Sequence, residues 1–426
     1  MRKFNFFKII TGLLCCTSTT AFAQADKSIV YYDRIYRDNI KTVQLHQTTW
    51  KFSPPIMQLN AGQQLQLDFD DLNGGYQSYY YTFIHCDANW QPSDLNAFDY
   101  MRGFTQDYIT DYANSFNTWQ GYTHYRLIFP NKNIQLLYSG NYMLKVYLNN
   151  IPDSVVFVKR FMIYEDMVTI NGREKQAIGE DMYTKQEVNF TINTSRYHIL
   201  DPFHAMQVVI MQNGRWDNAI TGLQPQFVQD NELQFFQDDG NEFDAGNQFR
   251  SFDMTSLRYN TEHIEGQIPS TKGVEIQLKK DVPRPTDPYF YFKDLNGQYM
   301  ILTKDADSAP VNSEYVWVHF FMPMDSSLKN GCIYIFGQLS DWQCQKEFQM
   351  KYDDVLGAYT AKVYLKQGYY EYEYAYLPNN ATLADIAKIE GNHYETGNTY
   401  YILVYNHEPG MYYDKLVGFT TFHGPQ

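Results

Sequence analysis

The stretch Tyr370-Glu-Tyr-Glu-Tyr-Ala-Tyr-Leu377 carries an aromatic residue at every second position. Side chains two residues apart lie on the same face of a β-strand, so this alternation predicts a strand with four tyrosine rings side by side. A second strand is predicted from Tyr359 to Leu365, and the short stretch 366–369 between the two predicts a turn. We therefore expect the two segments to form a β-hairpin.

Alternation of this kind, together with the composition, predicts an all-β protein. The chain of 426 residues contains 38 Tyr, 29 Phe and 6 Trp, and tyrosine and phenylalanine favour strands because their rings suit a pleated, half-buried surface. Helical signals are sparse: residues 382–391 predict about two turns of helix, and residues 93–116 predict a long loop with short helical pieces. Further alternating stretches are Gln64–Phe69, Tyr142–Leu148 and Val188–Ile192.

The alternation lapses at two places, which we interpret as domain boundaries. Glu165-Asp166 follows a strongly apolar run from Val155 to Tyr164, and Asp305-Ala-Asp-Ser-Ala-Pro310 is a polar break. These lapses predict three domains in tandem, over residues 26–165, 166–309 and 310–426. Each domain is predicted to be an antiparallel β-sandwich of the immunoglobulin-like type. A transmembrane barrel is not favoured, because it needs evenly spaced strands of about ten residues, and these strands are shorter and unevenly spaced.

Residues 1–23 predict a secretory signal peptide. Three basic residues come first, an apolar stretch from Ile9 to Cys16 follows, and Ala21-Phe-Ala23 offers a small-residue cleavage site near Ala23. The apolar stretch is too short for a membrane span, which takes about 20 residues. Cys15 and Cys16 leave a lipoprotein as the alternative, although no small residue precedes either of them. The sequence therefore predicts an exported chain.

The charge balance and the motifs argue against two large classes of function. The net charge is −14, and it becomes −17 when the three basic residues of the leader are removed, so nucleic-acid phosphates would be repelled. The sequence contains no His-Glu-x-x-His, no Gly-x-Ser-x-Gly and no phosphate-binding glycine loop. We predict no catalytic residue, no metal and no cofactor. A carboxylate pair brought together only by the fold stays open as an alternative.

Three cysteines follow the predicted leader: Cys86, Cys332 and Cys344. An odd number argues against a disulfide framework, and a chain of this size does not need one. We expect small buried thiols. A disulfide between Cys332 and Cys344 stays open as an alternative.

One stretch of the last domain predicts a sugar-binding surface as an alternative function. The residues Cys332–Trp342, Gly357–Tyr359 and Tyr370–Tyr374 resemble the sandwich modules that bind starch and glycogen. In such modules an aromatic ring stacks on the sugar, and the resemblance assigns this role to Trp342, with Tyr372 as a second platform. The competing interpretation is that Trp342 only anchors its loop onto the sandwich.

Several longer stretches are spread over nearly all of the chain after the leader: Cys86-Asp-Ala-Asn-Trp90, Tyr122-Thr-His-Tyr125, Phe129-Pro-Asn131, Ser139-Gly-Asn-Tyr142, Gly246-Asn-Gln-Phe-Arg-Ser-Phe-Asp253, Asp294-Leu-Asn-Gly297, Tyr364-Leu-Lys-Gln-Gly-Tyr-Tyr370 and His393-Tyr-Glu395. With these stretches the chain resembles the plug protein family of the type IX (type 9) secretion system. It departs from the family pattern at Gln248, where an acidic residue is expected, and at Tyr412 and Lys415, where arginines are expected.

This resemblance implies a non-enzymatic periplasmic protein at the inner face of the outer membrane. It would dock on the large outer-membrane β-barrel translocon and seal the periplasmic opening of the barrel when the system is idle. Tyrosine-rich surfaces would supply amphipathic contact area. The irregular stretch from Trp90 to Trp119, with Tyr100, Tyr108 and Tyr112, is the expected interface loop. The competing interpretation is that these rings pack beneath the loop.

Overall fold

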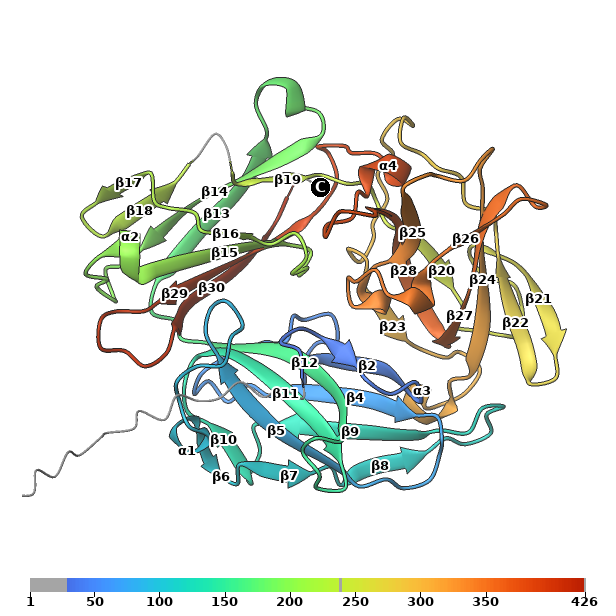
Figure 1. The fold of residues 1–426 in the computed structure, drawn as a ribbon, viewed down its shortest axis with the longest axis horizontal. Coiled ribbons are helices and arrows are strands. Elements are labelled where there is room, and N and C mark those ends of the chain that lie inside the picture. Colours follow the sequence, from blue (N-terminus) through green and yellow to red (C-terminus); the bar gives the residue numbers. More distant parts are fainter. Residues whose placement is uncertain (1–28, 237–239, 425–426) are drawn as a thin grey trace, which may run out of the picture.

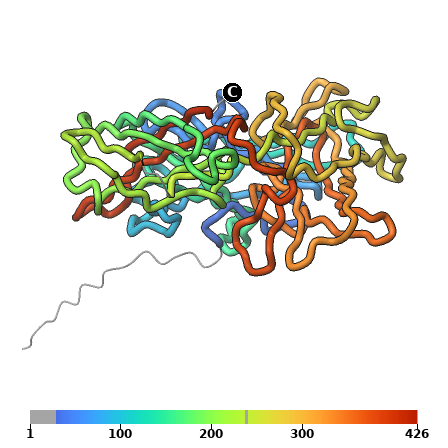
Figure 2. The backbone as a smooth tube through the Cα atoms, turned by 90° about the horizontal axis from the view of Figure 1, so that it is seen from above, coloured from blue at the N-terminus to red at the C-terminus, as the bar shows by residue number. Residues whose placement is uncertain are grey.

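The computed structural model describes residues 29–424 except 237–239, and nearly all of its regular structure is β-strand. The predicted signal peptide, with Cys15 and Cys16, lies outside the described residues. The strands form three lobes. The first lobe lies beneath the other two (Figure 1), and the middle and third lobes lie side by side when seen from above (Figure 2). Each lobe packs mostly antiparallel sheets around its own hydrophobic core, which confirms the predicted tandem β-sandwiches.

The first lobe comprises residues 29–165 and packs two main sheets face to face over rings such as Phe69 and Phe157. The stretch predicted as a long loop contains one helical turn, α1 (Ala97–Tyr100), and three short strands. One sheet has the order β1 (Arg34–Ile35), β12 (Val155–Tyr164), β11 (Gly140–Leu148), β5 (Tyr79–Cys86) and β7 (Gln106–Tyr108), with β3 (Ile56–Gln58) beside β12; the other has β2 (Ile40–Gln47), β4 (Leu65–Asp71), β9 (Thr123–Phe129) and β8 (Asp111–Asn114); β10 (Ile134–Leu136) pairs with β6 (Met101–Gly103).

The middle lobe is assembled from two separate parts of the chain. Residues 166–245 supply most of its strands, and the C-terminal strands from residues 399–423 complete one of its sheets. The short helices are η1 (Gly179–Asp181) and α2 (Pro202–Ala205). One sheet has β13 (Thr169–Gln176), β14 (Lys185–Asn193), β18 (Glu232–Phe235) and β17 (Phe227–Gln229), with β19 (Glu242–Asp244) on β14; the other has β16 (Ile220–Thr221), β15 (Met206–Gln212), β29 (Thr399–Asn406) and β30 (Lys415–His423).

The third lobe comprises residues 246–395, which lie between the two parts of the middle lobe. The helix predicted over residues 382–391 is one turn, α4 (Ala387–Glu390); the other short helices are α3 (Ala309–Asn312), η2 (Gln338–Ser340) and η3 (Lys346–Phe348). One sheet has β20 (Arg250–Asp253), β28 (Gly368–Pro378) and β23 (Tyr299–Ile301), with β25 (Gly331–Phe336) on β28; the other has β21 (Ile264–Ser270), β22 (Gly273–Leu278), β24 (Tyr315–Pro323), β27 (Ala358–Lys366) and β26 (Lys351–Asp353).

Two expectations from the sequence are wrong. The predicted domain boundary between residues 309 and 310 is wrong for two reasons. Strands β20 to β23, which precede it, belong to the third lobe. Strands β29 and β30, which follow it, belong to the middle lobe, where β29 pairs with β15 and β30 pairs with β29. The expected hairpin of residues 359–377 also fails, because β27 and β28 lie in opposite sheets of one sandwich. The four tyrosines of β28 do share a face, and all four are buried between these sheets.

A fourth hydrophobic core joins the first lobe to the middle lobe. Met143 and Met162 on the outer face of one sheet pack with Val209 and Leu403 on the outer face of the other. The sheet containing β11 and β12 is therefore covered on both faces. This explains why the run from Val155 to Tyr164 is almost continuously apolar instead of alternating.

Candidate functional site at the junction of the three lobes

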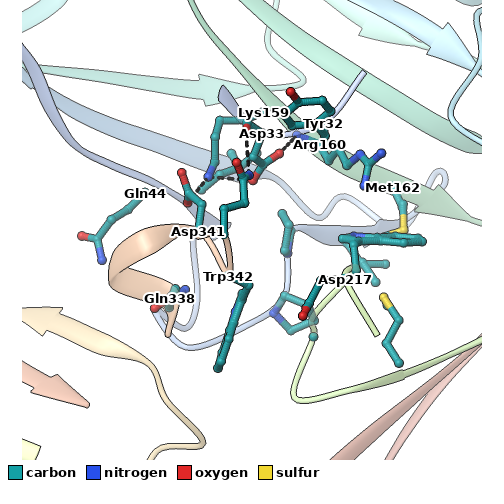
Figure 3. Close-up of a pocket in the computed structure, with 18 of the residues that line it drawn as sticks. Tyr32, Asp33, Gln44, Lys159, Arg160, Met162, Asp217, Gln338, Asp341 and Trp342 are labelled. Atoms are coloured by element: carbon teal, nitrogen blue, oxygen red, sulfur yellow. Dashed lines mark hydrogen bonds and ion pairs between the residues drawn. The ribbon is translucent and has the colours of Figure 1, made fainter. Parts of the chain in front are cut away.

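The three lobes meet around a cavity of about 370 Å³ (Figure 3). Strand β12 supplies one wall, the loop after η2 supplies the opposite wall, and the loop after β15 closes the side. No single lobe could form this cavity, because its lining comes from segments far apart in the sequence. The lining includes Asp33, Lys159, Arg160 and Met162 from the first lobe, Met211, Trp216, Asp217 and Tyr401 from the middle lobe, and Tyr299, Gln338, Asp341 and Trp342 from the third.

Lys159 bridges two carboxylates at the edge of this cavity. Its Nζ lies 2.7 Å from Asp33 Oδ2 and 2.7 Å from Asp341 Oδ1 (Figure 3). Burial lowers the pKa of Lys159, but the two neighbouring carboxylates outweigh this effect and raise it above its ordinary value. The ammonium group is therefore held charged, and it ties the first lobe to the third.

Trp342 lies in this cavity rather than on an open sheet of the third lobe. Asp341 and Trp342 adopt left-handed backbone angles, with φ of 53° and 54°, and the Trp342 N–H donates to Gly337 O at 3.0 Å. The indole ring meets Phe336 edge-on at 5.6 Å between centroids, and the guanidinium carbon of Arg215 lies 5.3 Å from its centroid. Trp342 therefore both anchors its loop, as the competing interpretation expected, and lines the cavity.

Tyr372 does not form a second stacking platform, so this part of the sugar-binding prediction is wrong. Its side chain is 0 % exposed, and its hydroxyl donates to Asp281 Oδ2 at 2.6 Å inside the third lobe. The tyrosine alternation in β28 builds the core of the sandwich. The resemblance to starch-binding modules therefore reflects the fold and not a preserved pair of platforms.

The middle and third lobes are joined by Arg215. Its guanidinium pairs with Asp217 at 2.6 Å within its own lobe and lies 3.5 Å from Glu373 Oε1 of the third lobe. Burial raises the pKa of Glu373 to about 8, and the nearby positive charge of Arg215 opposes this rise. This contact places a cation between the two lobes where it also stacks on Trp342.

The first and third lobes are joined by a fully buried ion pair. Lys366 Nζ lies 2.5 Å from Asp70 Oδ2, and both side chains are 1 % exposed. The Tyr315 hydroxyl donates to the same oxygen at 2.6 Å. His124 places Nδ1 2.8 Å from Asp70 and Nε2 3.1 Å from Asp68. Burial opposes protonation of His124, but these hydrogen bonds outweigh it and raise the pKa of the imidazole.

The residues of the expected interface loop do not lie on one surface. Trp90 is 4 % exposed and packs against Trp216 at the contact with the middle lobe; Tyr100 is 5 % exposed, and its hydroxyl donates to Phe83 O. These two residues follow the competing interpretation of buried rings. Tyr108, Tyr112 and Trp119 are 43–49 % exposed, and the Trp119 N–H donates to Glu314 of the third lobe.

Three more exposed rings on the same stretch were missed: Phe98 at 80 %, Phe104 at 61 % and Phe116 at 74 % exposure. The signal was present in the sequence, because three phenylalanines stand in a polar, irregular segment that offers no strand to bury them. Elements α1, β6 and β7 lie on the side of the first lobe that faces away from the other two lobes (Figure 1). We call Phe98, Phe104 and Tyr108, which lie on or next to these elements, the outer aromatic edge. Phe116 lies elsewhere, because its N–H donates to Val311 O of the third lobe at 2.9 Å.

Cys86, Cys332 and Cys344 are free thiols, so the alternative disulfide is not formed. Across residues 29–236 and 240–424, no group of three or more His, Cys, Asp or Glu side chains could hold a metal ion. The helices in that part of the chain are single turns, none of which could span a bilayer.

Comparisons with known proteins place the chain in a family. Residues 40–165, which make up most of the first lobe, match the family model for the first domain of type 9 secretion system plug proteins. The crystal structure of a hypothetical protein from Parabacteroides merdae is 32% identical in sequence over 93% of this chain and 100% of that chain, with a TM-score of 0.90. No curated protein matches the chain. The chain belongs to the type 9 secretion system plug protein family.

Proposed function

We propose that this protein is a non-enzymatic periplasmic plug. It docks on the large outer-membrane β-barrel translocon of the type 9 secretion system and closes the periplasmic opening of that barrel while no substrate is exported. The observation that carries the proposal is the match of the first lobe to the plug family model. Export by a cleaved signal peptide near Ala23 is part of the same proposal.

The construction of the body supports this role. A cover for a water-filled pore must not deform, and here each pair of lobes is joined by buried contacts. The first and middle lobes share a hydrophobic core, Lys366 and Asp70 pair between the first and third lobes, and Arg215 lies between the middle and third lobes. Close-packed interiors resist deformation, so we expect these buried contacts to limit movement between the lobes.

The outer aromatic edge is the surface we assign to the translocon. Large exposed aromatic rings are enriched at protein interfaces because they bury much apolar area with few rotatable bonds. Phe98 and Phe104 flank β6 and are among the most exposed large apolar side chains of the protein. Trp90 and Tyr100 are left out of this surface because they are buried.

The test is an affinity purification of the tagged protein from gently solubilised envelopes, with its partners identified by mass spectrometry. We expect the wild-type protein to recover the translocon barrel. The double variant Phe98→Glu/Phe104→Glu should recover much less of it, because charge is disfavoured at the centre of an interface. Val355→Glu is the matched control, since Val355 is 94 % exposed on the third lobe and away from this edge.

Two outcomes would count against the proposal. If the wild-type chain is purified without the barrel, although the barrel is intact in the same extract, docking is excluded. If cells that lack the protein but keep the translocon show normal resistance to large antibiotics, sealing is excluded. If the double variant recovers as much of the barrel as the wild type does, the contact with the translocon does not lie at the outer aromatic edge.

A further inference from the structure

A second cavity, of about 480 Å³, lies beside the first and is also built from all three lobes. Pro54 and Tyr401 line both cavities, so the two adjoin. The volume is within the range of about 300–1,000 Å³ that is typical of small-molecule sites. The first lobe supplies Trp50 and Phe52 from the loop between β2 and β3; the third lobe supplies Gln248, Tyr291 and residues 293–298; the middle lobe supplies residues 397–399, Thr421 and His423.

Exposed aromatic rings stand in the wall of this second cavity. Trp50 is 60 % exposed and Tyr291 is 50 % exposed, although both are large rings that proteins usually bury. Phe52 meets Trp50 edge-on, with 6.3 Å between centroids, and supports it from the side. Open indole and phenol faces are suited to stacking on a flat apolar surface.

Uncharged polar groups form much of the remaining lining. Asn296 Nδ2 donates to Thr399 Oγ1 at 2.9 Å, and that hydroxyl also lies 2.9 Å from His423 Nδ1. Gln298 and Thr421 line the same cavity. Amides and hydroxyls both donate and accept hydrogen bonds, which is also the bonding pattern of a sugar hydroxyl. The mutual hydrogen bonds hold these groups in place before any ligand arrives.

The charges around the cavity favour a neutral ligand. Asp294 accepts hydrogen bonds from the N–H groups of Phe249 at 2.9 Å and Asn296 at 3.2 Å, so its carboxylate is already satisfied by the backbone. Burial raises the pKa of Asp294 above its ordinary value. Lys293 is exposed to water at the cavity. An anionic ligand would therefore be desolvated without a buried cation of the lining to meet it, and a cationic ligand would meet a carboxylate that already has its backbone partners.

From this arrangement we propose that the second cavity binds an uncharged oligosaccharide, with sugar rings stacked on Trp50 and Tyr291 and hydroxyls bonded to the amides and hydroxyls beneath. The site is distinct from the predicted pair Trp342 and Tyr372. It goes beyond the proposed sealing role and does not depend on it.

The test uses the full mature chain and three neutral probes: maltotriose, cellotriose and triacetylchitotriose. Binding is measured by isothermal titration calorimetry and by tryptophan emission, which should shift to shorter wavelength when a sugar covers Trp50. We expect at least one probe to bind, and the variants Trp50→Ala and Tyr291→Ala to weaken that binding about tenfold or more. Both side chains are exposed, so both variants should fold normally.

Trp317→Ala is the matched control, because Trp317 is 41 % exposed on β24 and does not line the cavity. Its affinity for the probe should equal that of the wild type. The proposal is overturned if none of the three probes binds at about 10 mM, or if Trp50→Ala binds as the wild type does. Binding that is lost in Trp342→Ala and kept in Trp50→Ala would assign the sugar to the first cavity instead.

Discussion

Tyr315 reaches from the third lobe to the first, where its hydroxyl donates to Asp70 and its ring meets Tyr122 edge-on at 5.4 Å between centroids. Tyr122 in turn donates to Ser313 O at 2.9 Å, and Tyr405 joins the middle lobe to Asn141 of the first at 2.8 Å. A tyrosine combines a large apolar ring with a hydroxyl that needs a partner when buried. Some of the tyrosines, which were expected to serve an exposed surface, therefore join the lobes, and others build the cores of single lobes.

His124 leads to a prediction about pH. Its two ring nitrogens face Asp68 and Asp70, with His46, Arg126 and Lys366 also close to these carboxylates. The pKa of His124 is raised in the folded state, so its stabilising effect is complete below the unfolded value of about 6.5 and is lost as the pH rises through the folded value. We expect His124→Gln to cost about 2 kcal/mol near pH 5.5 and progressively less at higher pH.

Urea unfolding at several pH values measures this difference. His198→Gln is the control, because His198 is exposed in the middle lobe and lies outside this cluster. Its free energy of unfolding should equal that of the wild type at each pH. A His124→Gln penalty that grows as the pH rises would contradict the assignment of a protonated imidazole between the two carboxylates.

At the scale of the strand, period-2 alternation predicted correctly which residues share a face. Tyr370, Tyr372, Tyr374 and Tyr376 lie in one core. Alternation could not predict the partner of the strand, because pairing depends on residues far away in the sequence. Here only Gln367 separates β27 from β28, and the chain crosses between sheets at this point instead of turning back. The alternation within one strand therefore does not predict which strand lies beside it.

Gly368, the first residue after this crossing, allows β23 to approach β28 closely, and replacing it tests that pairing. A Cβ at this position would lie 2.3 Å from Met300 O of β23, the strand that pairs with β28. We expect Gly368→Ala to lower the free energy of unfolding by about 1–3 kcal/mol, because the backbones of two paired strands must separate. Thermal and urea unfolding measure the loss.

Gly266→Ala is the matched control for this substitution. Gly266 also lies in a strand of the third lobe, and a Cβ there would meet no atom within 4 Å. Its effect should stay within about 0.5 kcal/mol of zero. Equal stability of Gly368→Ala and the wild type would show that β23 and β28 do not approach each other as described.

At the scale of the whole molecule, the cavities could not be predicted because no local pattern marks them. Asp33, Lys159 and Trp216 belong to no binding motif, and they meet Asp341 only after three lobes have packed together. The exposed part of the interface loop could be predicted from the sequence, because its aromatic residues interrupt a polar and irregular stretch. The division between the middle and third lobes could not be predicted, because the C-terminal strands return to a lobe that begins more than 200 residues earlier.

Because β29 and β30 belong to the middle lobe, a C-terminal truncation should unfold that lobe and spare the third. A chain ending at Glu395 keeps every strand of the third lobe but loses β29 and β30, which are two of the four strands in one sheet of the middle lobe. It also loses Tyr401, Leu403, Tyr405 and Leu416 from the core shared with the first lobe. We expect hydrogen exchange to become fast in β13 to β19, while β24, β27 and β28 stay protected. If protection is lost instead across residues 310–378, the C-terminal strands belong to the third lobe, as a linear division of the chain would require.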